Sequence, residues 1–111
     1  MSVPCIRPDP PYYSVTFSNQ RSSDNNDDGS YDDMAERMVQ LAAKQPGFLG
    51  VDSARDAEGF GIAVSYWKDL TSIEGWRTNS EHLEAQRLGR DQWYQSYSLR
   101  IAKVEGAYTG P

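Results

Sequence analysis

The sequence predicts a small α+β domain with the element order β-α-β-β-α-β. Residues 12–20, 60–67 and 97–104 alternate along the chain as half-buried strands do, whereas residues 31–44 repeat apolar side chains at helical spacing. Residues 48–55 and 60–67 also flank a short loop that contains glycine, as the arms of a hairpin do. A chain of 111 residues suits a single domain, of a size at which about two thirds of the unfolded chain's surface is buried.

The first 11 residues carry four prolines, whose fixed φ and missing N–H groups favour an extended arm over a helix or a central strand. Such an arm can lie across a neighbouring subunit. Residues 12–111 are then expected to form one domain. In the first strand, residues 12–20, alternation places Tyr13, Val15, Phe17 and Asn19 on one side. Asn19 shares this apolar face, where its amide needs a partner or a ligand.

Residues 21–29 form a polar loop, and Ser30 with Asp33 predicts the start of a helix over residues 31–44. Its apolar stripe consists of Met34, Met38, Leu41 and Ala42. The run Gln45-Pro46-Gly47 ends the helix, because proline cannot continue the hydrogen-bond ladder and glycine permits the turn.

The hairpin strands, residues 48–55 and 60–67, are joined by residues 56–59. In the second strand, the side chains on one face are bulky. The other face carries the small residues Gly61, Ala63 and Ser65, followed by the large Trp67. A face of small residues leaves space for another layer or for a ligand.

Two helical segments and a final strand follow. The sequence Thr71-Ser72-Ile73-Glu74 fits a capping box, which predicts a short helix through Trp76 and Arg77. Asn79 can cap a second segment that ends near Gly89, residues 92–94 fit one more turn, and residues 97–104 form the last strand.

This order is that of the ferredoxin-like split βαβ fold, a four-stranded antiparallel sheet with helices on one face. Apolar side chains lie on both sides of the strands at 12–20, 60–67 and 97–104, so the face away from the helices is expected to be covered as well. A homodimer that pairs the two sheets would cover it.

Composition excludes several classes of protein. A net charge of −5 argues against a nucleic-acid binder, which needs a cationic face. The single cysteine, Cys5, can form no internal disulfide and fits a reducing compartment. No signal peptide and no apolar run of about 20 residues is present, so we expect a soluble cytoplasmic protein with no membrane partner.

The stretch 61–97 contains all three tryptophans and the only histidine, which makes it the expected wall of a pocket. His82 is the one group whose usual pKa lies near neutrality. Aromatic walls with amide and guanidinium groups would bind a flat organic molecule, and the candidates are Asn19, Trp67, Trp76, His82, Gln86, Arg90 and Tyr94. The alternative is structural, with Trp67 and Trp76 packing helix against sheet, Asn19 satisfying a strand end and Arg90 binding a carboxylate.

Other site types have little support in the sequence. There is no His pair, HExxH or CxxC, so no metal site is expected. The acids of residues 24–33 lack EF-hand spacing, and Gly59-Phe60-Gly61 is a lone GxG inside a hairpin. A Ser-His-Asp triad stays open, although no nucleophile-elbow sequence is present.

The runs QPGFLG, SYWKDLTSIEGW and HLEAQRLGRDQWYQSYSLRIAKVEGAY, in this strand order, resemble the antibiotic biosynthesis monooxygenase superfamily, most of all its small uncharacterised bacterial members. The resemblance covers about residues 12–108. It implies a dimeric α+β barrel built from two ferredoxin-like protomers, each with a pocket between sheet and helices. Members of the superfamily oxygenate aromatic polyketides without metal or flavin, degrade heme, act on quinol-like signals, or have no known activity.

In the heme-degrading branch the functional residues are an Asn on the first strand, a Trp in the second helical region and a His ten residues later. Asn19 and Trp76 match the first two, whereas the third position holds Gln86, a poor axial iron ligand, and His82 lies one turn earlier.

The leading hypothesis is therefore a cofactor-independent monooxygenase for a small planar aromatic or quinol-type substrate. In it Trp67 and Trp76 shape the pocket, and Asn19, His82 and Arg90 handle protons and charge. The alternatives are a heme-binding or heme-degrading protein and a non-catalytic small-ligand-binding or stress-related dimer.

Overall fold

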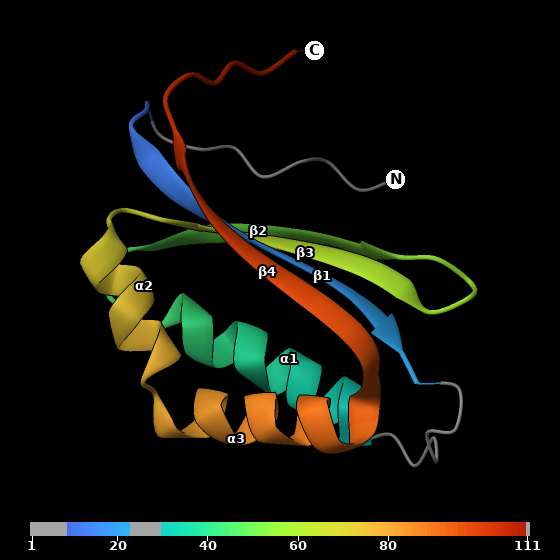
Figure 1. The fold of residues 1–111 in the computed structure, drawn as a ribbon. Coiled ribbons are helices and arrows are strands. Elements are labelled where there is room, and N and C mark those ends of the chain that lie inside the picture. The colour runs from blue at the N-terminus through green and yellow to red at the C-terminus, as the bar shows by residue number, and fades with distance from the viewer. Residues whose placement is uncertain (1–8, 23–29, 111) are drawn as a thin grey trace.

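The computed structural model describes residues 9–22 and 30–110. It is a four-stranded antiparallel sheet with the helices packed on one face (Figure 1). The elements are β1 (Tyr12–Arg21), α1 (Ser30–Ala43), β2 (Phe48–Arg55), β3 (Phe60–Trp67), α2 (Leu70–Arg77), α3 (Ser80–Leu88), η1 (Gly89–Trp93) and β4 (Tyr94–Val104). The predicted ferredoxin-like α+β fold is thus confirmed. Most of the proline-rich arm, Cys5, most of the polar loop and the side chain of Ser30 lie outside the described residues.

The strand order is β2-β3-β1-β4, and every neighbouring pair is antiparallel. The register aligns Arg55 with Gly61, Gly61 with Asn19, and Asn19 with Tyr97, so that these four residues form one row across the sheet. Because side chains alternate between faces, the whole row shares the face that carries Val15, Phe17, Ala63 and Ser65. This is the face that the helices cover.

Helix α1 ends where the sequence predicts, and the turn after it requires glycine. Gly47 has φ +81°, a left-handed backbone conformation that is energetically unfavourable for residues with a Cβ. A Cβ at this position would also lie 2.0 Å from Ser72 Oγ. The carbonyl of Gly47 accepts from Lys68 N–H at 2.7 Å, so the turn is tied to the end of β3. Glycine at residue 47 therefore lets α2 approach the α1–β2 turn.

The start of α2 differs from the prediction. Its N-cap is Asp69, whose Oδ1 accepts from Ser72 N–H at 2.8 Å and from Ser72 Oγ at 2.7 Å. The helix therefore starts at Leu70, and the capping box expected at Thr71 and Glu74 is wrong, because both residues already lie inside the helix. A carboxylate at the N-terminus also meets the positive end of the helix dipole.

Helix α3 begins as predicted, with Asn79 Oδ1 accepting from the backbone N–H groups of Glu81 and His82 at 3.0 and 3.2 Å. It ends at Leu88, in agreement with the predicted end near Gly89; the π-helical turn η1 follows directly, and β4 begins at Tyr94. The separate turn predicted at residues 92–94, and the strand start at residue 97, were therefore placed too late. Gly89 allows the continuation, since a Cβ there would lie 2.8 Å from the Tyr94 ring.

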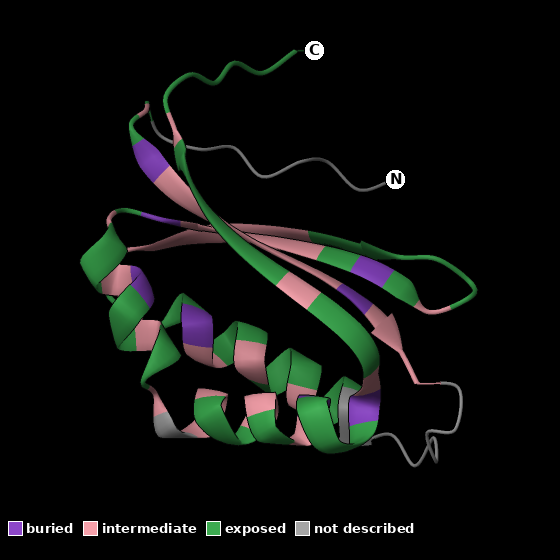
Figure 2. Ribbon diagram, viewed as in Figure 1, coloured by how far each residue is buried: buried purple, intermediate pink, exposed green. Residues whose placement is uncertain are grey.

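The hydrophobic core is small and lies at one end of the molecule. Trp67 is fully buried there between Ala42 of α1 and Ile73 of α2, and partly buried neighbours complete the cluster, namely Tyr13, Val15, Phe48 and Trp76. Elsewhere between the layers the side chains are mostly intermediate or exposed, as Figure 2 shows along α1, α3 and β4. The fully packed cluster thus lies at the α2 end, and Trp93 of η1 is buried outside it. Within the described ranges, no helix has the length and apolar character that crossing a membrane requires.

Candidate functional site

A cavity of about 610 Å³ lies between the sheet and the three α-helices. Most of its wall is apolar, and its aromatic side chains are Phe17, Phe48, Trp67, Trp76, Trp93 and Tyr94. Leu99 and Ile101 of β4 line the cavity and yet are 49% and 40% exposed, so the cavity opens to solvent along this edge strand. Its volume and apolar wall are typical of a small-molecule site.

The polar groups of the wall are few and none of them is acidic. Among the described residues that line the cavity, Arg55, Arg77 and His82 are basic, and no Asp or Glu is present, although the whole chain carries 16 acidic and 11 basic residues. The charged residues of the wall are thus basic in an acidic protein, although Arg77 also pairs with Glu74 at 3.4 Å. Such a lining favours ligands with electron-rich or anionic oxygens.

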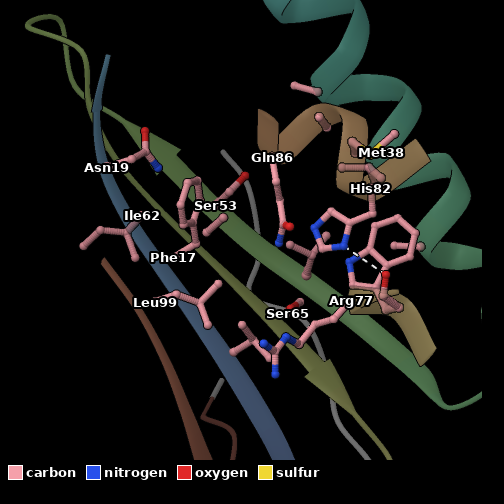
Figure 3. A pocket seen from close by; sticks show the side chains of 18 of the residues that line it. Phe17, Asn19, Met38, Ser53, Ile62, Ser65, Arg77, His82, Gln86 and Leu99 are labelled. Carbon is pink, nitrogen blue, oxygen red and sulfur yellow. Dashed lines mark hydrogen bonds between the residues drawn. The ribbon is translucent and has the colours of Figure 1, made fainter. Parts of the chain in front are cut away.

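His82 lies flat against Trp76. The ring centroids are 4.3 Å apart at an interplanar angle of 13°, and His82 Nδ1 lies 3.0 Å from the backbone carbonyl oxygen of Trp76 (Figure 3). A carbonyl can only accept, so Nδ1 carries the proton and donates it. In the neutral ring the other nitrogen, Nε2, then holds the lone pair.

The local sequence explains this placement. The cap at Asn79 starts α3 directly after α2, so that His82, in the first turn of α3, folds back over the end of α2. The Trp76 carbonyl at that end accepts from both Asn79 N–H, at 3.1 Å, and the imidazole. The orphan carbonyl at the end of one helix therefore holds the histidine of the next.

Burial lowers the pKa of His82 below its usual value of 6.5, and the positive charge of Arg77 lowers it further, while the hydrogen bond to Trp76 opposes the change. The imidazole is consequently neutral at pH 7. It is suited to accept a proton or a hydrogen bond at Nε2.

The tryptophans form a short stack that leads from the core to His82. The ring centroids of Trp67 and Trp76 are 6.3 Å apart at 26°, and Trp67 Nε1 donates to Ser65 Oγ at 2.9 Å. The structural interpretation of Trp67 is confirmed, since it packs α1 and α2 against the sheet, and the same ring also lines the cavity. The stack gives the imidazole a rigid support.

At the other end of the cavity, Asn19 is 3% exposed and Arg55 Nη2 donates to its Oδ1 at 2.7 Å. In Figure 3 the amide nitrogen of Asn19 is directed toward the cavity. Gln86, one turn after His82, extends its amide from α3 into the same space.

Six of the seven candidates from the sequence line this one cavity: Asn19, Trp67, Trp76, His82, Gln86 and Tyr94. Arg90 does not; it is exposed on η1. Two arginines that the sequence reasoning did not select, Arg55 and Arg77, belong to the wall instead. Only the observed register of the hairpin brings Arg55 opposite the small residue Gly61, so the sequence alone gave no signal for it. In the part of the chain that the structure describes, no three His, Cys, Asp or Glu side chains come together to hold a metal ion.

Comparison with known proteins shows the family. The sequence model described as "Antibiotic biosynthesis monooxygenase" matches residues 29–88. The chain is 55% identical over 98 residues to the uncharacterized protein YqjZ of Bacillus subtilis (strain 168), a match that covers 88% of this chain and 83% of that protein.

Two more distant matches agree. The chain is 39% identical over 46 residues to the jasmonate monooxygenase ABM of Pyricularia oryzae, covering 41% of this chain and 21% of that protein. Rv0793 from Mycobacterium tuberculosis has the same fold, with a TM-score of 0.73 at 11% identity over 87% of this chain and 99% of that one. The matching family model and the similarity to YqjZ show that the chain belongs to the antibiotic biosynthesis monooxygenase family.

Proposed function

We propose that the cavity is the active site of a cofactor-independent monooxygenase that acts on a small planar aromatic or quinol-type substrate, and that the chain works as a homodimer. The observation that carries this proposal is the neutral His82 at the wall of an apolar cavity, held by the Trp76 carbonyl at 3.0 Å so that Nε2 is a free base. Family membership and the name of the Pyricularia relative support monooxygenase chemistry.

In the proposed reaction, His82 Nε2 accepts a proton from the substrate. Removal of the proton leaves an electron-rich anion, which the apolar cavity does not hydrate and which therefore reacts more readily with dioxygen. Developing negative charge on the substrate oxygen is stabilised by the Asn19 amide and by the two arginines of the wall. The flat Trp76 and Trp67 rings favour a planar substrate.

The chemistry balances without an external reductant. For an anthrone-type substrate, a CH₂ group and O₂ give a C=O group and H₂O, so the substrate itself supplies all four electrons. For a quinol, hydroxylation of one ring carbon and oxidation of the ring to a quinone together consume one O₂ and release one water. One oxygen atom enters the product in each case.

Oxygen consumption tests the proposal. The purified protein should consume O₂ with anthrone or naphthalene-1,4-diol above the rate of spontaneous oxidation, and His82→Gln should lower the protein-dependent rate by about 10²-fold or more, since the base is lost. Leu83→Gln, at the next position but exposed and outside the cavity, is the matched control and should keep the rate. Saturable binding of both compounds with no O₂ consumption would instead show a binding protein.

Heme is the second candidate, favoured by the same lone pair on His82 Nε2. His82 would hold the iron, because Gln86 stands where the heme-degrading branch has histidine, and Asn19 and Trp76 would flank the group. Heme would supply oxygen activation at its iron. Titration with hemin should then give a saturating Soret change that His82→Ala abolishes, and a linear change that never saturates would exclude this candidate.

The proposed dimer rests on the sheet face away from the helices. Phe60 on this face is 44% exposed, and alternation places it with Val64 and Tyr66. A partner sheet packed on this face would bury these side chains.

A further inference from the structure

We infer that Arg55 is a positioning residue: it holds the Asn19 amide with its N–H groups toward the cavity, so that the ligand must present an oxygen acceptor at the sheet wall. The inference deepens the proposed function and rests on it for the class of ligand. The restraint of Asn19 by Arg55 is independent of that function.

The row of residues across the sheet makes the contact possible. Arg55 on β2 and Asn19 on β1 are not on neighbouring strands, because Gly61 of β3 lies between them in the register. A Cβ on Gly61 would lie 2.8 Å from Arg55 Cζ and 2.9 Å from Nη2. The guanidinium group thus passes over the one residue in the row that has no side chain.

Two hydrogen bonds of the guanidinium group fix the direction of the amide. Arg55 Nη1 donates to the carbonyl of Gly59 at 2.5 Å, which anchors the group, and Nη2 donates to Asn19 Oδ1 at 2.7 Å. A guanidinium group only donates, so the amide oxygen must face it and the Nδ2 group must face the other way. A flipped amide would place N–H groups against N–H groups.

This orientation leaves a buried donor without an acceptor. Asn19 is 3% exposed, and no described residue accepts from its Nδ2. Figure 3 shows the nitrogen directed toward the cavity, whose wall includes Asn19. Buried donors in native proteins are nearly always satisfied, so a bound oxygen acceptor is the partner that this group lacks.

Two planar probes that differ in one carbonyl group test the inference: 9-fluorenone, which accepts a hydrogen bond, and fluorene, which does not. Equilibrium dialysis should show that the wild-type protein binds fluorenone about tenfold more tightly, the value of one hydrogen bond to a buried donor. Arg55→Met should bring the ratio of the two dissociation constants close to one, because the freed amide can turn. Gly61→Ala should do the same by displacing the guanidinium group, whereas Gly75→Ala, where a Cβ meets nothing within 4 Å, should leave the ratio unchanged.

A double-mutant cycle separates positioning from a direct contact with the probe. If Arg55 acts through Asn19, then Arg55→Met should change the ratio no further in an Asn19→Ala background. The inference would be overturned if Arg55→Met kept the tenfold preference for fluorenone. It would also be overturned if Arg55→Met lowered that preference by the same factor in the wild-type and the Asn19→Ala proteins.

If neither probe binds, that result counts against the proposed function alone. Nitrogen-15 relaxation of the Asn19 side chain then tests directly whether Arg55 restrains the amide. The Nδ2 order parameter should be near that of rigid backbone, about 0.85, and should fall toward about 0.6 in Arg55→Met and Gly61→Ala but not in Gly75→Ala. The Asn19 signals are identified by their loss in Asn19→Asp. An order parameter that is the same with and without Arg55 would refute the restraint.

Discussion

The imidazole of His82 is stacked on the indole of Trp76 and donates its Nδ1 proton to the backbone of that same residue. One residue thus supplies both the surface that supports the ring and the carbonyl that selects its tautomer. The pair joins the last turn of α2 to the first turn of α3, and the geometry of the proposed base depends on both helices.

The first prediction concerns the pKa of His82. Burial and Arg77 lower this pKa, so titration by proton NMR should place it below the usual value of 6.5. The chain has one histidine, which makes the assignment unambiguous. Arg77→Gln should raise the pKa, because a positive charge near the ring is removed. A wild-type pKa at or above 6.5 would contradict the buried, neutral imidazole.

The second prediction is the pH dependence of folding stability that this group causes. The folded state disfavours the protonated ring, so the unfolded chain binds the proton more readily and the free energy of unfolding falls as pH decreases below about 6.5. His82→Phe should remove this part of the dependence. Urea unfolding at pH 7.5 and pH 5.0 gives the loss of unfolding free energy between the two pH values for each protein. The wild-type loss minus the His82→Phe loss is the contribution of His82, because the carboxylates titrate in both proteins. Equal losses of stability in both would show that His82 makes no contribution.

The third prediction compares two glycines. Gly47→Ala should lower the free energy of unfolding by about 1–3 kcal/mol, because Gly47 has φ +81° and a Cβ there would overlap Ser72. Gly75→Ala lies inside α2 with open space around it and should be neutral or stabilising by up to about 1 kcal/mol. Denaturant unfolding of both variants provides the test. Destabilisation of similar size in the two would mean that the close approach of α2 to this turn is not needed.

The fourth prediction concerns assembly. Sedimentation equilibrium should show a dimer, and Val64→Lys, in the middle of the sheet face away from the helices, should produce monomers by placing a charge in the interface. Glu84→Gln on α3 is a surface control that should not change the mass. A folded wild-type monomer at all accessible concentrations would disprove the homodimer.

Local patterns predicted the elements and the fold class, whereas side-chain contacts between distant residues could not be predicted from them. The hairpin strands have the predicted ends, residues 48–55 and 60–67, because alternation and the glycine of the loop act within a few residues. The start of α2 was less certain by nature, since Asp69 and Thr71 are both good N-cap residues two positions apart. In the structure the cap is Asp69, which accepts from both the backbone N–H and the hydroxyl of Ser72.

Most residues of the candidate site could be predicted from their chemical type, because aromatic and amide side chains close in sequence to the one histidine are suited to the wall of a ligand pocket. Arg55 was missed because its partner Asn19 is 36 residues away and the two meet only across Gly61. Arg90, one of the candidates from the sequence, does not line the cavity. The π-helical turn η1 adds a residue to one turn and so shifts the direction of the side chains in it, and Trp93 rather than Arg90 lines the cavity.

The confinement of the packed cluster to the α2 end has an evolutionary consequence. Substitutions on the open part of the wall change the shape and polarity offered to a guest molecule without disturbing the contacts that fold the chain. Lineages can therefore diverge in chemistry while they retain one architecture. Rv0793 retains the same topology at 11% identity.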